Sequence, residues 1–211
     1  MPPRLTAPDR RRQILRCATA VFARSNYRAA GVAEIAREAG VSEPLLYKHF
    51  ASKKAIFIEI LGRVGARIVE IWEEAIAGAP DALTALRIAG EVYIENMREH
   101  PAEARLQFQA LAEASDPEIA AVLQSNHRAY VELFERLLEQ GRREGVIRAD
   151  VDPHAAAWLL NGTGFTFTLM RLLDFDGAVS SAARAEPVMT SLLEWLAAPA
   201  AFTDLVTKER T

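Results

Sequence analysis

A run of hydrogen-bond donors is threaded between apolar residues at positions 40–57, GVSEPLLYKHFASKKAIF. Within it, Leu46 and Phe50 are four residues apart, so on a helix they share one face and can anchor it to a core. The donors then fall on other faces: Tyr47, Lys48 and His49. A tyrosine hydroxyl, a lysine ammonium and a histidine N–H can all donate to phosphate oxygens. The stretch therefore predicts a short helix that is held by apolar side chains and presents polar ones to a phosphate backbone.

This helix is the second of two that flank a glycine turn. Residues 32–39 form the first predicted helix, 40–42 the turn and 43–49 the second helix. Two helices joined by a short turn of this kind define a helix-turn-helix. A helix as short as the second is not stable alone, so a core must hold it. Its outer face is then free to enter a DNA major groove, which is about 12 Å wide.

The elements that position the motif are predicted to be helical throughout. Ala, Leu, Glu and Arg dominate the sequence, and strand-like alternation is nearly absent. Ser52 is a predicted cap for a long helix over 53–77, and Asp152-Pro153 is a cap-plus-proline start for a helix to 173. The other predicted helices span 9–25, 80–99, 100–114, 115–140 and 183–197. A loop over 174–182 and a frayed tail over 199–211 complete an all-α fold of nine helices.

The charge of the chain is divided between its two parts. The whole chain carries a formal net charge of −3, but residues 1–54 carry 11 Lys and Arg against four Asp and Glu, a net +7. A basic head on an acidic body predicts a polyanion as the partner of the head. It also indicates that the body is not the nucleic-acid surface.

Several classes of protein are disfavoured. No apolar run approaches the roughly 20 residues that a membrane span needs, so we expect no membrane partner. The basic N-terminus lacks the apolar segment of a secretory signal. Cys17 is the only cysteine, which excludes an internal disulfide framework and fits a reduced, cytoplasmic setting. The sequence has no nucleophile motif, phosphate-binding glycine loop or histidine pair at metal-ligand spacing, so we predict no enzyme activity, cofactor or metal site.

Residues 9–57 resemble the DNA-binding domain of the TetR family of transcriptional regulators. The positions that carry the resemblance are Ile14-Leu15, Ala18, Phe22, Tyr27, Ile35-Ala36, Ala39-Gly40-Val41-Ser42, Leu46-Tyr47, His49-Phe50 and Lys53. The resemblance implies a three-helix DNA-binding domain at 1–53 and a helical ligand-binding and dimerisation domain at 54–198. It also implies these DNA-binding residues: Gly31, Ser42, Glu43, Pro44, Leu45, Tyr47, Lys48, His49 and Lys53. We expect Lys53, at a helix start that favours anions, to bind phosphate.

Three positions depart from the family pattern. Asn26 replaces the usual glycine before the aromatic residue, and asparagine tolerates left-handed geometry. Gly31 replaces the Thr or Ser that commonly caps the second helix, which removes a hydroxyl. Pro44 replaces a frequent glycine and stiffens the start of the recognition helix. These changes affect the individual contacts, not the expected docking mode.

The body offers candidates for a pocket and a dimer interface, both implied by the resemblance. Pocket candidates are large or polar side chains on central helices: Trp72, Tyr93, Met97, Phe108, Asn126, Trp158 and Phe165. Dimer-interface candidates are Gly162, Thr166, Leu192, Trp195 and Leu196. Glycines and threonines inside the helix at 152–173 allow another helix or a ligand to approach closely, and a local crossing within the core is the other explanation.

The function predicted from these observations is that of a ligand-responsive DNA-binding regulator of the TetR type, acting as a repressor. It would bind a near-palindromic operator in double-stranded DNA as a homodimer and be released by an unknown, mostly apolar small-molecule effector. The alternative is a helix-turn-helix regulator without a small-molecule effector, gated by a protein partner or constitutive. An apolar cavity of roughly 300–1,000 Å³ in the body would favour the first.

Overall fold

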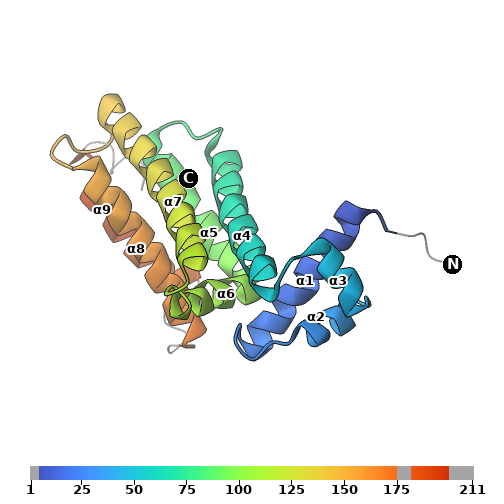
Figure 1. Ribbon diagram of the computed structural model, residues 1–211. Coiled ribbons are helices and arrows are strands. Elements are labelled where there is room, and N and C mark those ends of the chain that lie inside the picture. Colours follow the sequence, from blue (N-terminus) through green and yellow to red (C-terminus); the bar gives the residue numbers. More distant parts are fainter. Residues whose placement is uncertain (1–4, 175–181, 200–211) are drawn as a thin grey trace. The chain divides into compact units, whose positions relative to one another are not determined.

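The computed structural model describes residues 5–174 and 182–199, and within them the fold is all-α (Figure 1). These residues form nine helices and one isolated bridge between Ile147 and Ala197. The helices are α1 (Ala7–Ser25), α2 (Val32–Glu38), α3 (Glu43–His49), α4 (Lys53–Ile76), α5 (Ala82–Glu99), α6 (Pro101–Ala112), α7 (Pro117–Glu144), α8 (Pro153–Leu172) and α9 (Ala182–Leu196). The predicted all-α fold of nine helices is confirmed. The predicted loop at 174–182 and the predicted tail lie almost wholly outside the described residues.

Side-chain caps account for the helix starts that the sequence predicted. Ser42 Oγ accepts from the Leu45 amide at 3.4 Å, and Ser52 Oγ accepts from the Ala55 amide at 3.0 Å. Asp152 Oδ1 accepts from Ala155 at 2.7 Å. Each of these bonds satisfies a backbone N–H that the first turn of a helix leaves without a partner. The helix α1 begins two residues before its predicted start, because Thr6 supplies the cap.

The predicted end of α7 at Gln140 was wrong, since the helix continues through Gly141 to Glu144. A Cβ at Gly141 would lie 2.3 Å from Ile147 Cγ1 and 3.1 Å from Ala82 Cβ. This glycine therefore makes room for a close approach of the chain inside the helix and does not end it. Gly145, with φ +76°, is the residue in the left-handed region that follows the helix.

The first of two compact units contains the helix-turn-helix. It comprises the chain up to Gly65 together with His100–Ser125, so α1, α2, α3 and α6 belong to it with the first parts of α4 and α7. Helix α1 packs against α2 and α6, and α2 packs against α3. Phe22 and Phe57 are fully buried at its centre, with ring centroids 5.2 Å apart in an edge-on arrangement. Aromatic pairs prefer such geometry, and this one joins α1 to α4.

The second unit comprises Ala66–Glu99 and the chain from Asn126 onward. Helix α5 packs against α8 and α9. Trp72 of α4 lies 5.3 Å from the Tyr130 ring and 5.0 Å from the Phe134 ring, both on α7. Its indole N–H donates to the Ala89 carbonyl oxygen at 3.0 Å, which gives a buried donor the partner it needs. The expected division of function at residue 53 remains a prediction.

None of the helices in the described ranges is both long enough and apolar enough to cross a bilayer.

Candidate functional site

Helix α3 is anchored by its apolar side and free on its polar side. Leu46 is fully buried, and Phe50, at the end of the helix, is 2% exposed. Tyr47 is 49% exposed. Other exposed residues of the helix and its cap are Ser42, Glu43, Pro44 and Lys48, and Leu45 and His49 are partly exposed. The division between anchoring and presented side chains is the one predicted from their spacing.

Arg11 of α1 fastens the end of α3. Its guanidinium lies 4.1 Å from the centroid of the Phe50 ring, donates to the carbonyl oxygen of His49, and pairs with Glu59 of α4. A cation at a helix C-terminus is favourable because the carbonyl groups there carry partial negative charge. Partial burial acts to raise the pKa of Glu59, but hydrogen bonds from Arg11 and Arg63 bring it below its ordinary value. Sequence reasoning treated Arg11 only as part of a basic run, because Glu59 is too distant in sequence to suggest the pairing.

Lys53, the first residue of α4, holds the loop between α1 and α2. Its ammonium donates to three carbonyl oxygens: Tyr27 at 2.8 Å, Ala30 at 3.0 Å and Arg28 at 3.1 Å. It also lies 4.9 Å from the centroid of the Tyr27 ring. An ammonium has three N–H groups, so these bonds use its whole capacity. Binding a phosphate through Lys53 would require one of the three to be given up.

Acidic residues of the connection between α6 and α7 and of the first turn of α7 neutralise part of the basic head. Lys54 pairs with Asp116 at 3.0 Å and with Glu118, and Arg28 pairs with Glu113 at 2.6 Å. Hydrogen bonds to Glu118 and Asp116 raise the pKa of Lys54. Among residues 5–54, five basic side chains form no ion pair: Arg10, Arg16, Arg37, Lys48 and Lys53. Two of them donate to other groups instead, Arg10 to Gln13 and Lys53 to the backbone. The net +7 of residues 1–54 therefore overstates the charge that is free to meet a polyanion.

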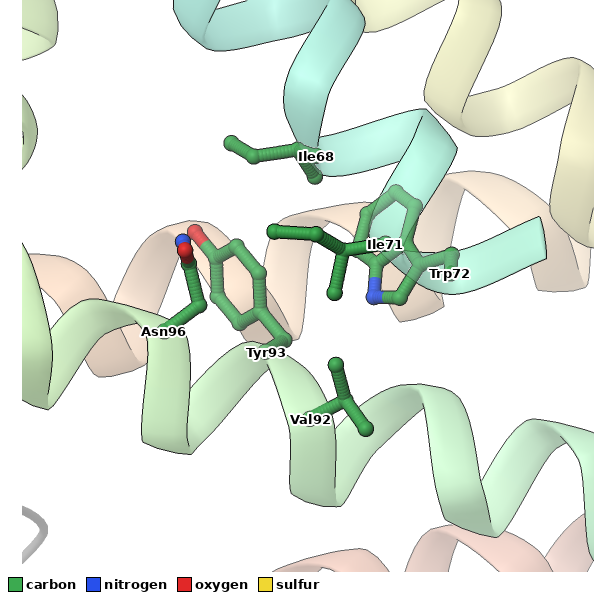
Figure 2. A pocket seen from close by; sticks show the side chains of 6 residues that line it. All are labelled: Ile68, Ile71, Trp72, Val92, Tyr93 and Asn96. Atoms are coloured by element: carbon green, nitrogen blue, oxygen red, sulfur yellow. The ribbon is translucent and has the colours of Figure 1, made fainter. Parts of the chain in front are cut away.

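A small pocket lies between α4 and α5 in the second unit (Figure 2). Its lining residues are Ile68, Ile71 and Trp72 from α4, and Val92, Tyr93 and Asn96 from α5. About 140 Å³ of empty space lies among these side chains, part of it open to solvent, and none of it is wide enough for a water molecule. Pockets for drug-sized ligands have about 300–1,000 Å³. This pocket is therefore smaller than the cavity that would favour an effector.

Two of the lining residues are polar and lie on the same face of α5, three positions apart (Figure 2). The Tyr93 hydroxyl is 2.8 Å from Thr168 Oγ1 of α8. Burial raises the pKa of Tyr93, so the hydroxyl keeps its proton at neutral pH. Asn96 Oδ1 is buried and has no hydrogen-bond partner among the described residues. An acceptor buried without a partner is uncommon in native proteins and calls for an explanation.

The predicted pocket residues are only partly brought together. Trp72 and Tyr93 line the pocket, and Met97 packs beside Tyr93 in a buried cluster with Phe167 and Ala185. The other candidates are not among its lining residues: Phe108, which belongs to the first unit, Asn126, Phe165, and Trp158, which is 51% exposed. Sequence reasoning missed Asn96. Its position three residues after Tyr93, on an otherwise apolar face, was a signal that could have identified it.

The surface of α8 and α9 carries exposed apolar residues. Trp158 and Leu159 of α8 are 51% and 53% exposed, and Val188 and Trp195 of α9 are 46% and 42% exposed. Gly162 and Thr166 are exposed, and nothing lies within 4 Å of a Cβ built at Gly162. Leu192 is half-buried, whereas Leu196 is fully buried within its own chain and offers no surface to a partner.

Gly164, in contrast, allows a crossing inside the unit. A Cβ at this position would lie 3.2 Å from Tyr93 Cε1, tighter than most contacts of real Cβ atoms. The small residues of α8 therefore divide between two uses that the sequence could not separate. Gly164 admits the Tyr93 ring of α5, and Gly162 lies on the open surface.

A short helix with buried anchors, an exposed polar face and a glycine turn before it, packed in a unit of helices, defines a helix-turn-helix DNA-binding protein. Comparison with known families identifies the family of this helix-turn-helix protein. Residues 14–60 match the profile described as "Bacterial regulatory proteins, tetR family", and residues 80–167 match "Tetracyclin repressor-like, C-terminal domain". The chain belongs to the TetR family of transcriptional regulators, and it is a regulator rather than an enzyme.

Individual relatives include both activators and repressors. The transcriptional activator FasR of Mycolicibacterium smegmatis is 36% identical over 56% of this chain, a match that spans 53% of that protein's length. The transcriptional repressor KstR2 of Rhodococcus jostii is 27% identical over 90% of this chain and 92% of its own. The structure of the regulator FadR from Bacillus subtilis, solved in complex with stearoyl-CoA, is similar in fold, with a TM-score of 0.79, 21% identity, and coverage of 88% of this chain and 98% of its own.

Proposed function

We propose that the chain is a repressor that binds a near-palindromic operator as a homodimer and is released by a mostly apolar small molecule. The Rhodococcus jostii relative, which aligns over 90% of the chain, is named a repressor, and this supports repression rather than activation. The relative that is 36% identical is named an activator, and this supports activation, but over a shorter part of the chain. A reporter gene behind the operator, measured with and without the protein, decides between them. Lower expression with the protein present is expected, and higher expression would refute the repressor role.

The observation that carries the DNA-binding role is the exposure of α3. The first turn of a recognition helix reaches deepest into the groove, and there Glu43 can accept from cytosine N4 while Leu45 can pack on a thymine methyl group. Tyr47 and Lys48 are exposed donors for phosphate. Two further members of the proposed set, Ser42 and Gly31, cap α3 and α2, so their part is to place the helices.

The exposed apolar surface of α8 and α9 supports the homodimer. Isolated apolar residues are normal on a protein surface, but four large ones on two helices, beside an open glycine, favour an interface. A two-fold dimer presents two recognition helices, which is why the operator is expected to be near-palindromic. Sedimentation at micromolar concentration should show a dimer, and a monomer there would refute this part of the proposal.

The effector part rests on the pocket between α4 and α5. Helix α4 begins with the residue that holds the α1–α2 loop and contributes three residues to the pocket lining. A ligand that binds one state of this helix more tightly than another changes operator affinity by that difference. This pocket has no room for a water molecule, which favours the second candidate, a regulator without a small-molecule effector.

A thermal-shift screen followed by gel shifts distinguishes the two candidates. Under the first proposal, at least one apolar compound raises the melting temperature and weakens operator binding. If compounds bind and operator affinity does not change, release by an effector is refuted and the second candidate gains.

A further inference from the structure

The pocket between α4 and α5 has an electrically neutral lining. Four of its six residues are aliphatic or indole side chains, and the other two are Tyr93 and Asn96 (Figure 2). Burying an ionised group without a partner is costly, so such a lining disfavours a carboxylate or an ammonium. A ligand that enters it must be neutral where it meets these residues.

Each of the two polar side chains of the lining offers an acceptor oxygen. Thr168 Oγ1 lies 3.0 Å from the Gly164 carbonyl oxygen, one turn earlier on α8, and 2.7 Å from Met97 Sδ. Both are acceptors, so the single proton of the threonine hydroxyl is donated to one of them. Thr168 then accepts from the Tyr93 hydroxyl at 2.8 Å. The Tyr93 proton is thereby used, and its oxygen retains lone pairs that can only accept.

Asn96 provides the second acceptor. Its Oδ1 is buried in the pocket lining and has no partner among the described residues. Leaving such an oxygen without a donor is costly, and a ligand that supplies the donor recovers that free energy on binding. Because Tyr93 and Asn96 share one face of α5, their oxygens can serve one polar head group.

From this arrangement, and on the basis of the effector site proposed above, we infer that the ligand is a neutral amphiphile whose head donates a hydrogen bond to Asn96 Oδ1, an alcohol or an amide with an N–H and not a fatty acid anion. The pocket has no room for a water molecule in this structure, so the head group enters only when lining side chains move aside. The apolar chain extends toward the buried cluster that contains Met97, against which both Tyr93 and Met189 pack. Methionine side chains are unbranched and flexible, so they can move aside.

The test uses three probes of equal chain length: 1-decanol, decyl methyl ether and decanoate. The alcohol donates and accepts, the ether only accepts, and decanoate at neutral pH is an anion without a donor. Isothermal titration calorimetry on the full chain should show the alcohol binding about tenfold more tightly than the ether, the effect of leaving one buried acceptor unpaired. Decanoate should bind more weakly than the alcohol by a similar factor or more.

Two variants assign the preference to one atom. Asn96→Leu removes the acceptor and keeps a side chain of similar size. Asn96→Ala removes the acceptor and introduces a residue that favours the helix. With both variants, one remains informative if the other does not fold. Each should bring the alcohol-to-ether ratio to within about threefold of one, mainly by weakening the alcohol. The control Val92→Ala changes the lining without changing the ratio.

Equal affinity for alcohol and ether in the wild type overturns the inference, and so does a ratio that survives in both Asn96 variants. Failure of the alcohol to bind at its solubility limit also overturns it. The outcome is separable from the proposed function by gel shift. Asn96-dependent binding without any change in operator affinity supports the inference and refutes effector release, whereas release by a ligand that is indifferent to Asn96 does the reverse.

Discussion

We expect Lys53 to stabilise the DNA-binding unit rather than to bind a DNA phosphate. The substitution Lys53→Met keeps the apolar stem beside the Tyr27 ring and removes the ammonium that joins three carbonyl groups. The bonds to Tyr27 and Ala30 are partly buried, and the bond to Arg28 is exposed, so water can replace only the last without loss. An acceptor left without its donor costs about 1–3 kcal/mol. Two such acceptors give an expected fall of about 2–6 kcal/mol in the free energy of unfolding.

The same substitution should leave the salt dependence of operator binding almost unchanged. Each phosphate neutralised by a protein cation contributes about −0.9 to the slope of log affinity against log salt. All three N–H groups of Lys53 are used within the protein, so its removal should not change that slope. Lys48 is the matched control, because it is exposed on α3 and forms no ion pair in the described part of the chain. Lys48→Met should lower the magnitude of the slope by about 0.9 and hardly affect stability.

The measurements are urea unfolding followed by circular dichroism, and fluorescence anisotropy of labelled operator across a salt series. If Lys53→Met lowers the slope by about one contact at unchanged stability, Lys53 binds phosphate as its place at a helix start predicted. The argument from its three carbonyl partners would then be refuted. A loss of stability with an unchanged slope identifies it as a residue that positions the α1–α2 loop.

Three further predictions concern other positions. Gly141→Ala should destabilise the protein by about 1–3 kcal/mol in urea unfolding, because the new Cβ meets Ile147. The control Gly90→Ala should be neutral or stabilising, because its Cβ meets only the flexible end of a methionine side chain. Equal effects of the two substitutions on stability would contradict the packing argument. Gly162→Trp should raise the dimer dissociation constant at least about tenfold in sedimentation, since the single chain has open space there, and an unchanged dimer would place the interface elsewhere. Leu45→Ala should change the sequence selected from randomised operators, and an unaltered preference would remove it from the base-reading set.

The helix-turn-helix and its presented face were predictable because their signals are local. Ser42, Ser52 and Asp152 cap helices through backbone amides three residues away, and the burial of Leu46 against the exposure of Tyr47 follows from the helical period. The charge count was local too, and for that reason it was incomplete. It could not include Glu113, which lies in the connection after α6, 85 residues further along the chain, and pairs with Arg28 of the head.

The sequence by itself therefore determined the helices, their caps and the face that α3 presents, since each depends on neighbours within about one turn. Only the tertiary structure decided that Lys53 bonds to carbonyl groups 23 to 26 residues earlier, that Gly141 admits Ile147 inside a helix, and that Asn96 lies buried without a partner. Hydrogen bonds and steric contacts act over a few ångströms of space, whatever the separation along the chain. The packing of the helices therefore determines which polar groups find a hydrogen-bond partner, which positions have no space for a side chain, and which groups are left without a partner.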